Sequence, residues 1–198
     1  MCHYLYSDRV TSNRERALQA AVELLGTSGL RALTHARVDA GAGLPPGSTS
    51  NYFRTRRALL TGVVEHMAVV ETPEVVALRA RTPHELADEL VRLFEFLTGP
   101  SKTMTTARMV LLVEASHDED LRAQLAAGRA AMERLMMPTL VALGAADPQA
   151  LMDAVAAAFE GMYLHRIARH ADIDPEPVFR LILRGGLPER SQSSEAPT

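Results

Sequence analysis

The chain has 198 residues, of which 47% are hydrophobic, and its single cysteine, Cys2, excludes an internal disulfide framework. The first ten residues lack the basic end and apolar core of a signal peptide, and no apolar run approaches the ~20 residues of a membrane span. We therefore expect a cytoplasmic protein with no membrane partner.

The net charge of -3 is unevenly distributed along the chain. Residues 1–63 contain eight Arg and four acidic residues, a net charge of +4, whereas residues 64–198 contain thirteen basic and twenty acidic residues, a net charge of -7. A basic N-terminal third joined to an acidic remainder is typical of a small DNA-binding unit attached to a domain that does not bind DNA.

The first predicted helix begins at Ser12, which forms a capping box with Glu15, and it ends at Gly26 to Gly29. Residues 34–57 then predict two short helices joined by a tight turn. Thr34 can cap the first of them and Gly43 can end it, and the preset φ of Pro46 is expected to restart helical geometry after Pro45 at the N-cap.

The second short helix contains Gly, Ser, Thr and Asn, which are weak helix formers. Their small polar groups and an exposed helix N-terminus suit phosphate oxygens and base edges in a DNA major groove. Arg54, Arg56 and Arg57 follow at the start of the next helix, where cations oppose the helix dipole unless they bind phosphates.

Helix start signals recur along the rest of the chain. Each is a capping residue, followed in most cases by proline at the first helical position. They are Thr55, with a helix expected to run toward Glu71, then Thr72-Pro73, Thr82-Pro83, Ser101, Asp147-Pro148 and Asp174-Pro175.

Two other features complete the predicted fold. The apolar run 109–113 predicts a fully buried central helix, and Pro138 predicts a kink or an end in the helix that follows. No alternating strand pattern is present, so we predict an all-α fold of nine or ten helices.

The run GLPPGSTSNYFRTRRALL resembles the recognition element of the TetR family of bacterial transcription regulators. The matching positions are Gly43, Pro46, Gly47, Tyr52, Phe53, Arg56, Ala58 and Leu59. Pro45, Thr49 and Ser50 depart from the serine and the bulkier mid-helix residues that are usual in the family, so the operator sequence cannot be read from the resemblance.

The resemblance implies an N-terminal helix-turn-helix domain at residues 12–62 and a helical ligand-binding and dimerisation domain at residues 63–187. An N-terminal extension (1–11) and a disordered tail (188–198) flank them. It also implies a homodimeric repressor that binds a pseudo-palindromic double-stranded DNA operator and is released by a small hydrophobic effector. The pairing helices would be residues 119–143 and 148–170.

Within that hypothesis, hydroxyl and basic groups fix the phosphate register, and Gly47, Thr49, Ser50 and Asn51 face base edges. Asn51 is the best single reader, because its amide can bond adenine through two hydrogen bonds. The predicted DNA-binding set is Thr34, Arg37, Pro46, Gly47, Ser48, Thr49, Ser50, Asn51, Tyr52 and Arg56.

Large adaptable apolar residues in the C-terminal part could line the effector pocket, although ordinary core packing is the more common role for each such residue. The predicted ligand-binding set is Phe94, Met104, Met109, Met136, Phe159, Met162 and Tyr163.

Catalysis is not expected, because the nucleophile-elbow, phosphate-loop and zinc-protease motifs are absent from the sequence. Glu114 and His117 have the spacing of a di-iron pair, but no second pair accompanies them. We predict no metal and no cofactor. The alternatives are a helical dimer that binds small molecules without reading DNA, and a helical enzyme.

Overall fold

The computed structural model describes residues 12–70 and 79–188. In these residues the chain forms nine α-helices and no strand, which confirms the predicted all-α fold. The predicted extension 1–11, Glu71, the start signal Thr72-Pro73 and the tail from residue 189 lie outside the described part.

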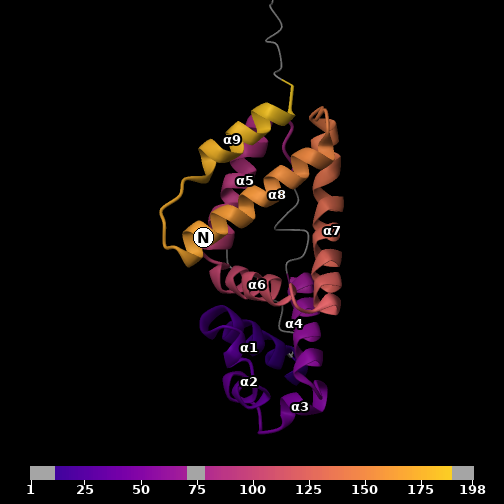
Figure 1. Cartoon of the computed structure of the whole chain (residues 1–198), viewed down its shortest axis with the longest axis vertical. Helices are drawn as coiled ribbons and strands as arrows, with labels where there is room; N and C mark the ends of the chain where they lie inside the picture. The colour runs from indigo at the N-terminus through magenta and orange to yellow at the C-terminus, as the bar shows by residue number, and fades with distance from the viewer. Residues whose placement is uncertain (1–11, 71–78, 189–198) are drawn as a thin grey trace, which may run out of the picture. The chain divides into compact units, whose positions relative to one another are not determined.

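The helices fall into two compact units (Figure 1). Unit 1 contains residues 12–70 and 103–127, and unit 2 contains residues 79–102 and 128–188. The predicted DNA-binding segment 12–62 therefore lies within unit 1, and its boundary at residue 62 stays a prediction. The helix bounds are α1 Asn13–Ser28, α2 His35–Ala42, α3 Ser48–Tyr52, α4 Arg56–Val70, α5 Pro83–Thr98, α6 Lys102–Glu114, α7 Glu119–Ala142, α8 Pro148–Tyr163 and α9 Pro175–Gly186.

Local sequence signals set most helix starts. The capping box of Ser12 and Glu15 is present, with hydrogen bonds of 2.8 and 3.2 Å between each side chain and the other residue's amide. The hydroxyl of Thr55 accepts a hydrogen bond from the amide of Ala58, and Thr82 caps α5 with Pro83 at its first position. These predicted caps are confirmed.

The core of unit 1 is formed by apolar residues of α1, α4, α6 and the start of α7, and α1 also packs on α2. Leu18, Leu25, Leu59, Val63 and Leu111 are all buried there. Gly62 allows a close approach within this core, because a Cβ at that position would lie 2.5 Å from Cε1 of the Phe53 ring.

The prediction that residues 109–113 are fully buried is wrong. Leu111 is buried, but Leu112 and Val113 are 43% and 72% exposed, so α6 buries only one face. Pro138 does not end its helix, since α7 continues through it to Ala142.

Unit 2 is built around four aromatic rings from α5, α8 and α9. Phe94 stacks on Tyr163 with ring centroids 5.7 Å apart, and Phe159 lies 4.7 Å from Phe179. A π-helical turn, Leu164–Ala168, extends α8 and carries Arg166, whose guanidinium lies 4.6 Å from the Phe94 ring centroid and donates to Glu95.

Replacing Gly62 with Val should destabilise unit 1 by about 1–3 kcal/mol, because the new side chain collides with the buried Phe53 ring. The free energy of unfolding from urea titration measures this. Gly41→Ala is the control, since its Cβ would meet only Ala20 at an ordinary 3.6 Å and should be neutral or slightly stabilising. Equal unfolding free energies for the two variants would contradict this packing.

Candidate DNA-binding interface

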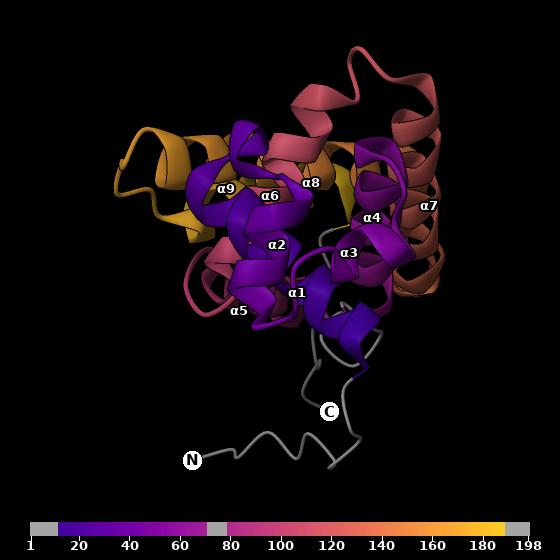
Figure 2. The ribbon, with the colours of Figure 1, turned by 90° about the horizontal axis from the view of Figure 1, so that it is seen from below.

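The helix-turn-helix, residues 34–53, comprises α2, a turn and α3, which Figure 2 shows from below. Thr34 caps α2 as predicted, with its hydroxyl accepting from the amide of Arg37 at 3.3 Å. At the other end Gly43 adopts a left-handed conformation (φ 62°). The guanidinium of Arg16 donates to the carbonyls of Ala42 and Gly43 at 2.6 and 3.1 Å, which places a positive charge at the negative end of the α2 dipole.

The start of α3 differs from the prediction. Pro45 and Pro46 lie in the turn and not at the start of the helix. The amide and the hydroxyl of Ser48 both donate hydrogen bonds to the carbonyl of Pro45. Helix α3 begins at Ser48, and its N-cap is Gly47, at φ 87°. The prediction that the helix restarts at Pro46 is therefore wrong, because these turn hydrogen bonds delay it by two residues.

Glycine has no side chain with which to cap α3, and Asp39 of α2 supplies the cap instead. Its carboxylate accepts from the amides of Gly47 and Thr49 at 2.8 and 2.7 Å and from the hydroxyl of Thr49 at 2.5 Å. Asp39 is 3% exposed and Thr49 is fully buried. The sequence patterns did not predict this role of Asp39. A signal was present, because Gly47 has no side chain to cap a helix and an acidic residue lies eight positions before it.

Opposing effects act on the Asp39 carboxyl. Burial raises its pKa, but the hydrogen bonds from Thr49 and Gly47, together with nearby His35, outweigh burial and hold the pKa below its ordinary value of 3.8. The group is therefore a carboxylate at neutral pH, with a negative charge beneath the positive end of α3.

This arrangement overturns two predictions about α3. Its first amides are already bonded, those of Gly47 and Thr49 to Asp39 and that of Ser48 to Pro45, so the helix N-terminus is not a free phosphate site. Thr49 cannot face a base edge, because its side chain is buried and its hydroxyl is bonded to Asp39.

The other predicted base-facing residues, Gly47, Ser50 and Asn51, are exposed, and so is Pro46. Among the predicted phosphate-binding residues, Thr34 and Arg37 are exposed and Tyr52 is 46% exposed. Their contacts with DNA stay predictions.

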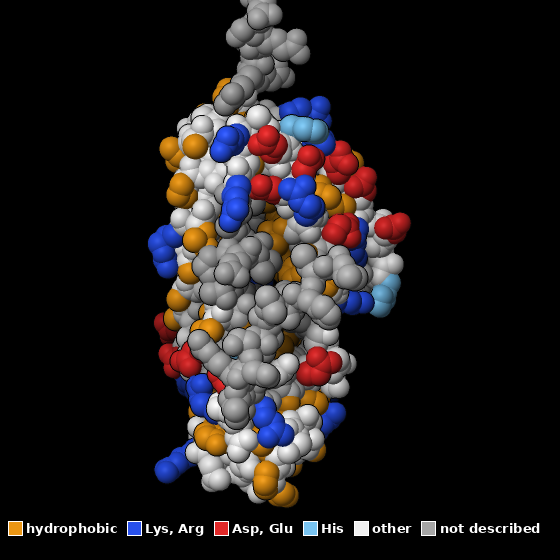
Figure 3. Space-filling model, turned by 180° about the vertical axis from the view of Figure 1, so that it is seen from behind, with side chains coloured by type: hydrophobic (Ala, Val, Ile, Leu, Met, Phe, Trp, Pro, Cys, Tyr) orange, Lys and Arg blue, Asp and Glu red, His pale blue; other side chains and the backbone are white. Residues whose placement is uncertain are grey.

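The basic residues at the start of α4 fall into two groups. Arg54 and Arg56 are exposed, and Arg56 donates to the carbonyl of Leu30 at 3.0 Å. Arg57 instead pairs with Asp118 and Asp120, so its expected role on phosphates is not supported. In Figure 3, the charged side chains visible at the lowest tip are basic.

A second contact fixes the far end of α3. His35 at the start of α2 lies with Nε2 2.6 Å from the carbonyl oxygen of Phe53, and because a carbonyl only accepts, this nitrogen must carry the proton. Both ends of α3 are thus tied to α2.

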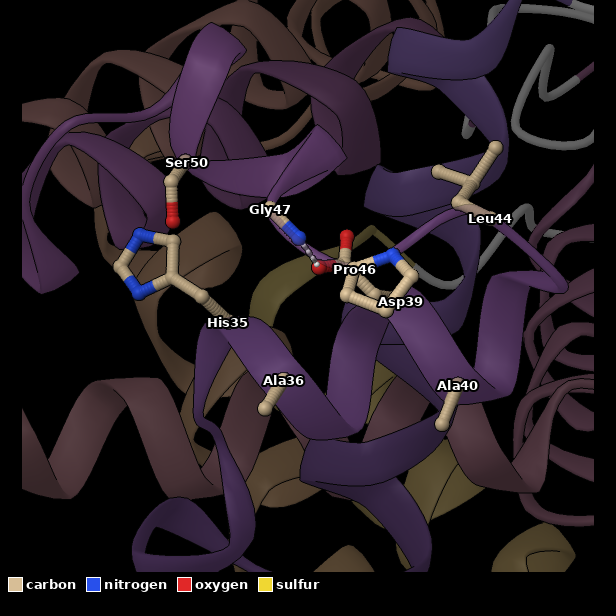
Figure 4. A pocket seen from close by; sticks show the side chains of 8 residues that line it. All are labelled: His35, Ala36, Asp39, Ala40, Leu44, Pro46, Gly47 and Ser50. Carbon is tan, nitrogen blue, oxygen red and sulfur yellow. Dashed lines mark hydrogen bonds between the residues drawn. The ribbon is translucent and has the colours of Figure 1, made fainter.

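Between α2 and α3 lies an open hollow of about 370 Å³ (Figure 4). Its lining is mostly small side chains: His35, Ala36, Asp39, Ala40, Leu44, Pro46, Gly47 and Ser50.

The predicted ligand-binding residues are divided between the units. Phe94, Phe159 and Tyr163 come together with Phe179, which sequence analysis missed, and Met136 and Met162 are buried in the same unit. Met104 and Met109 belong to unit 1, where Met104 packs against the core.

The described residues contain no cluster of three or more His, Cys, Asp or Glu that could hold a metal ion. Within the same ranges, no helix combines the length and apolar character needed to cross a bilayer.

Comparison with known proteins gives consistent matches. Residues 81–189 match the family described as "Tetracyclin repressor-like, C-terminal domain". The HTH-type transcriptional regulator BetI of Rhizobium meliloti (strain 1021) is 24% identical over 166 residues, which are 82% of each chain.

Solved structures share the fold. A TetR transcription regulator from Haloarcula marismortui superposes with a TM-score of 0.75 at 12% identity, covering 89% of this chain and 98% of its own. The multidrug binding protein EbrR complexed with ethidium gives a TM-score of 0.67 at 24% identity, covering 90% and 100%.

Replacing Asp39 with Asn should lower the free energy of unfolding by about 1–3 kcal/mol at pH 7, because the buried donors lose a charged acceptor. Since the pKa of Asp39 is lowered by folding, its contribution is fully present above about pH 4 and lost as the pH falls through the folded-state value. The gap between wild type and variant should therefore narrow in acid.

Urea titrations at pH 7 and pH 3 measure this gap, with Asp172→Asn at an exposed position as the control. A gap that is absent at pH 7, or that widens in acid, would contradict the role of the carboxylate.

Proposed function

Because this chain belongs to the TetR family of transcriptional regulators and not to a family of enzymes, we propose that it is a repressor whose homodimer binds a pseudo-palindromic DNA operator. A small hydrophobic effector bound by the C-terminal part releases the DNA. Residues 12–62 form the DNA-binding domain of this proposal and residues 63–187 the effector and dimerisation domain. Operator DNA as the partner implies action in the cytoplasm.

The observation that carries the proposal is the rigid presentation of α3. Asp39 fixes the first turn of α3 and His35 fixes its end, while Ser50 and Asn51 remain exposed between these ties. A short helix whose inward side is hydrogen-bonded and whose outward side carries small polar groups can approach base edges closely.

Phosphate contacts in this proposal come from side chains, since the first amides of α3 are occupied. Arg37, Tyr52 and Arg56 are exposed on α2, α3 and α4, respectively, and can reach the backbone on either side of a groove. The acidic remainder of the chain would repel the duplex and restrict binding to this end.

The proposed dimer is supported by an exposed stripe of small and apolar residues on α8 and the start of the π-helical turn that follows it. Its members repeat every three or four residues, so they lie on one helical face, and all are exposed in the single chain. They are Ala150, Ala154, Ala157, Gly161 and Leu164. Small side chains permit close approach of a second α8, and a two-fold dimer would place two copies of α3 about 34 Å apart or a multiple of it.

The effector is proposed to act through the aromatic core of unit 2. Phe94, Phe159 and Tyr163 offer the flat apolar faces that small hydrophobic molecules bind, and EbrR shows that a protein of this fold can hold ethidium. Release requires that the effector bind more tightly to dimers whose α3 helices do not fit both half-sites.

Replacing Asn51 with Ala should weaken binding to the preferred duplex about tenfold to hundredfold, because a bidentate base contact is lost. The duplex is first selected from random sequence with the wild-type protein, and affinity is then measured by fluorescence anisotropy. Binding to an unrelated duplex should not change. Asn13→Ala, at an exposed asparagine of α1, is the matched control. If Asn51→Ala binds both duplexes like wild type, Asn51 does not read DNA.

Replacing Ala157 with Glu should convert the dimer to a monomer, because it buries unpaired charges across the two-fold axis. Sedimentation velocity measures the mass, and Ala68→Glu, at an exposed position of α4, is the control. A wild-type monomer, or a dimer that persists in Ala157→Glu, would refute this interface.

A further inference from the structure

The hollow between α2 and α3 exists because the residues around it are small. Ala36 and Ala40 lie one turn apart on α2, and Gly47, the N-cap of α3, and Ser50 of α3 line the hollow with them (Figure 4). These four residues and Pro46 are exposed, so the hollow opens at the surface that carries Asn51.

The chemistry of the hollow favours an apolar group over a phosphate. Ala36, Ala40 and Pro46 contribute methyl and methylene surfaces. The negative charge in the lining is the carboxylate of Asp39, whose oxygens already accept hydrogen bonds from Gly47 and Thr49. This negative charge repels an anion, and the amides that donate to the carboxylate are not free to bind one.

The surface of a DNA major groove has one apolar protrusion, the C5-methyl group of thymine, which 5-methylcytosine shares. We propose that this hollow receives a pyrimidine C5-methyl group in each operator half-site, and so makes the protein select thymine there. This inference rests on the proposed function. The Ser50 hydroxyl, directed toward the His35 ring in Figure 4, lies at the rim, where it can bond the polar edge of the same base or its neighbour.

The DNA side of the test removes one methyl group at a time. In the duplex selected by wild-type protein, each thymine is replaced singly by deoxyuridine, which changes only the C5 substituent. At one thymine in each half-site, this replacement should lower the affinity of the protein for the duplex about fourfold, which corresponds to the burial of one methyl group. A duplex with 5-methylcytosine at that position should bind the protein more tightly than a duplex with unmethylated cytosine there.

The second part of the test changes the protein, by placing a larger side chain in the hollow. Ala36→Leu should bind thymine and deoxyuridine duplexes equally, because its side chain occupies the space of the methyl group. Ala68→Leu, an exposed alanine on α4, should retain the fourfold difference. Circular dichroism checks folding, and Ala40→Leu fills the same hollow from one turn further along α2 if the first variant does not fold.

The outcomes separate the two proposals. Specific binding with no methyl effect at any thymine, or a methyl effect that survives filling, overturns this inference and leaves the proposed function intact. Failure to select any sequence overturns both.

Discussion

Asp39 holds the start of α3 from beneath, through a buried carboxylate that accepts hydrogen bonds from Gly47 and Thr49. A helix of five residues with a glycine N-cap has little stability of its own. The exposed position of Asn51 therefore depends on a contact made from another helix, and that contact requires a buried charge with its hydrogen bonds satisfied.

Because Asp39 attaches α3 to α2, the contacts of these two helices with the rest of unit 1 set the position of both. With α3 fixed to α2, the orientation of the pair depends on how α2 and the end of α3 meet the rest of unit 1. Arg16 bonds the end of α2, and the Phe53 ring packs where Gly62 leaves room for it. The side chains left facing outward are small and polar, and the hollow lined by Ala36, Ala40 and Ser50 lies beside them.

Sequence patterns predicted the features that local interactions decide. The caps at Ser12, Thr34 and Thr82 involve partners within three residues, and all three are confirmed. The errors arose where a distant partner decides the outcome. Thr49 looked like an exposed polar residue because its partner, Asp39, is ten positions away, and Val113 looked buried because an apolar run does not show which face meets the core.

In the proposed function, residues 34–57 recognise a particular DNA sequence rather than phosphate charge alone. The most direct measurement is fluorescence anisotropy of the wild-type protein with a selected and an unrelated duplex across a salt series. We expect both affinities to fall as salt rises, while the selected duplex is still bound about a thousandfold or more tightly than the unrelated one. Equal and weak binding to both duplexes at every salt concentration would contradict it.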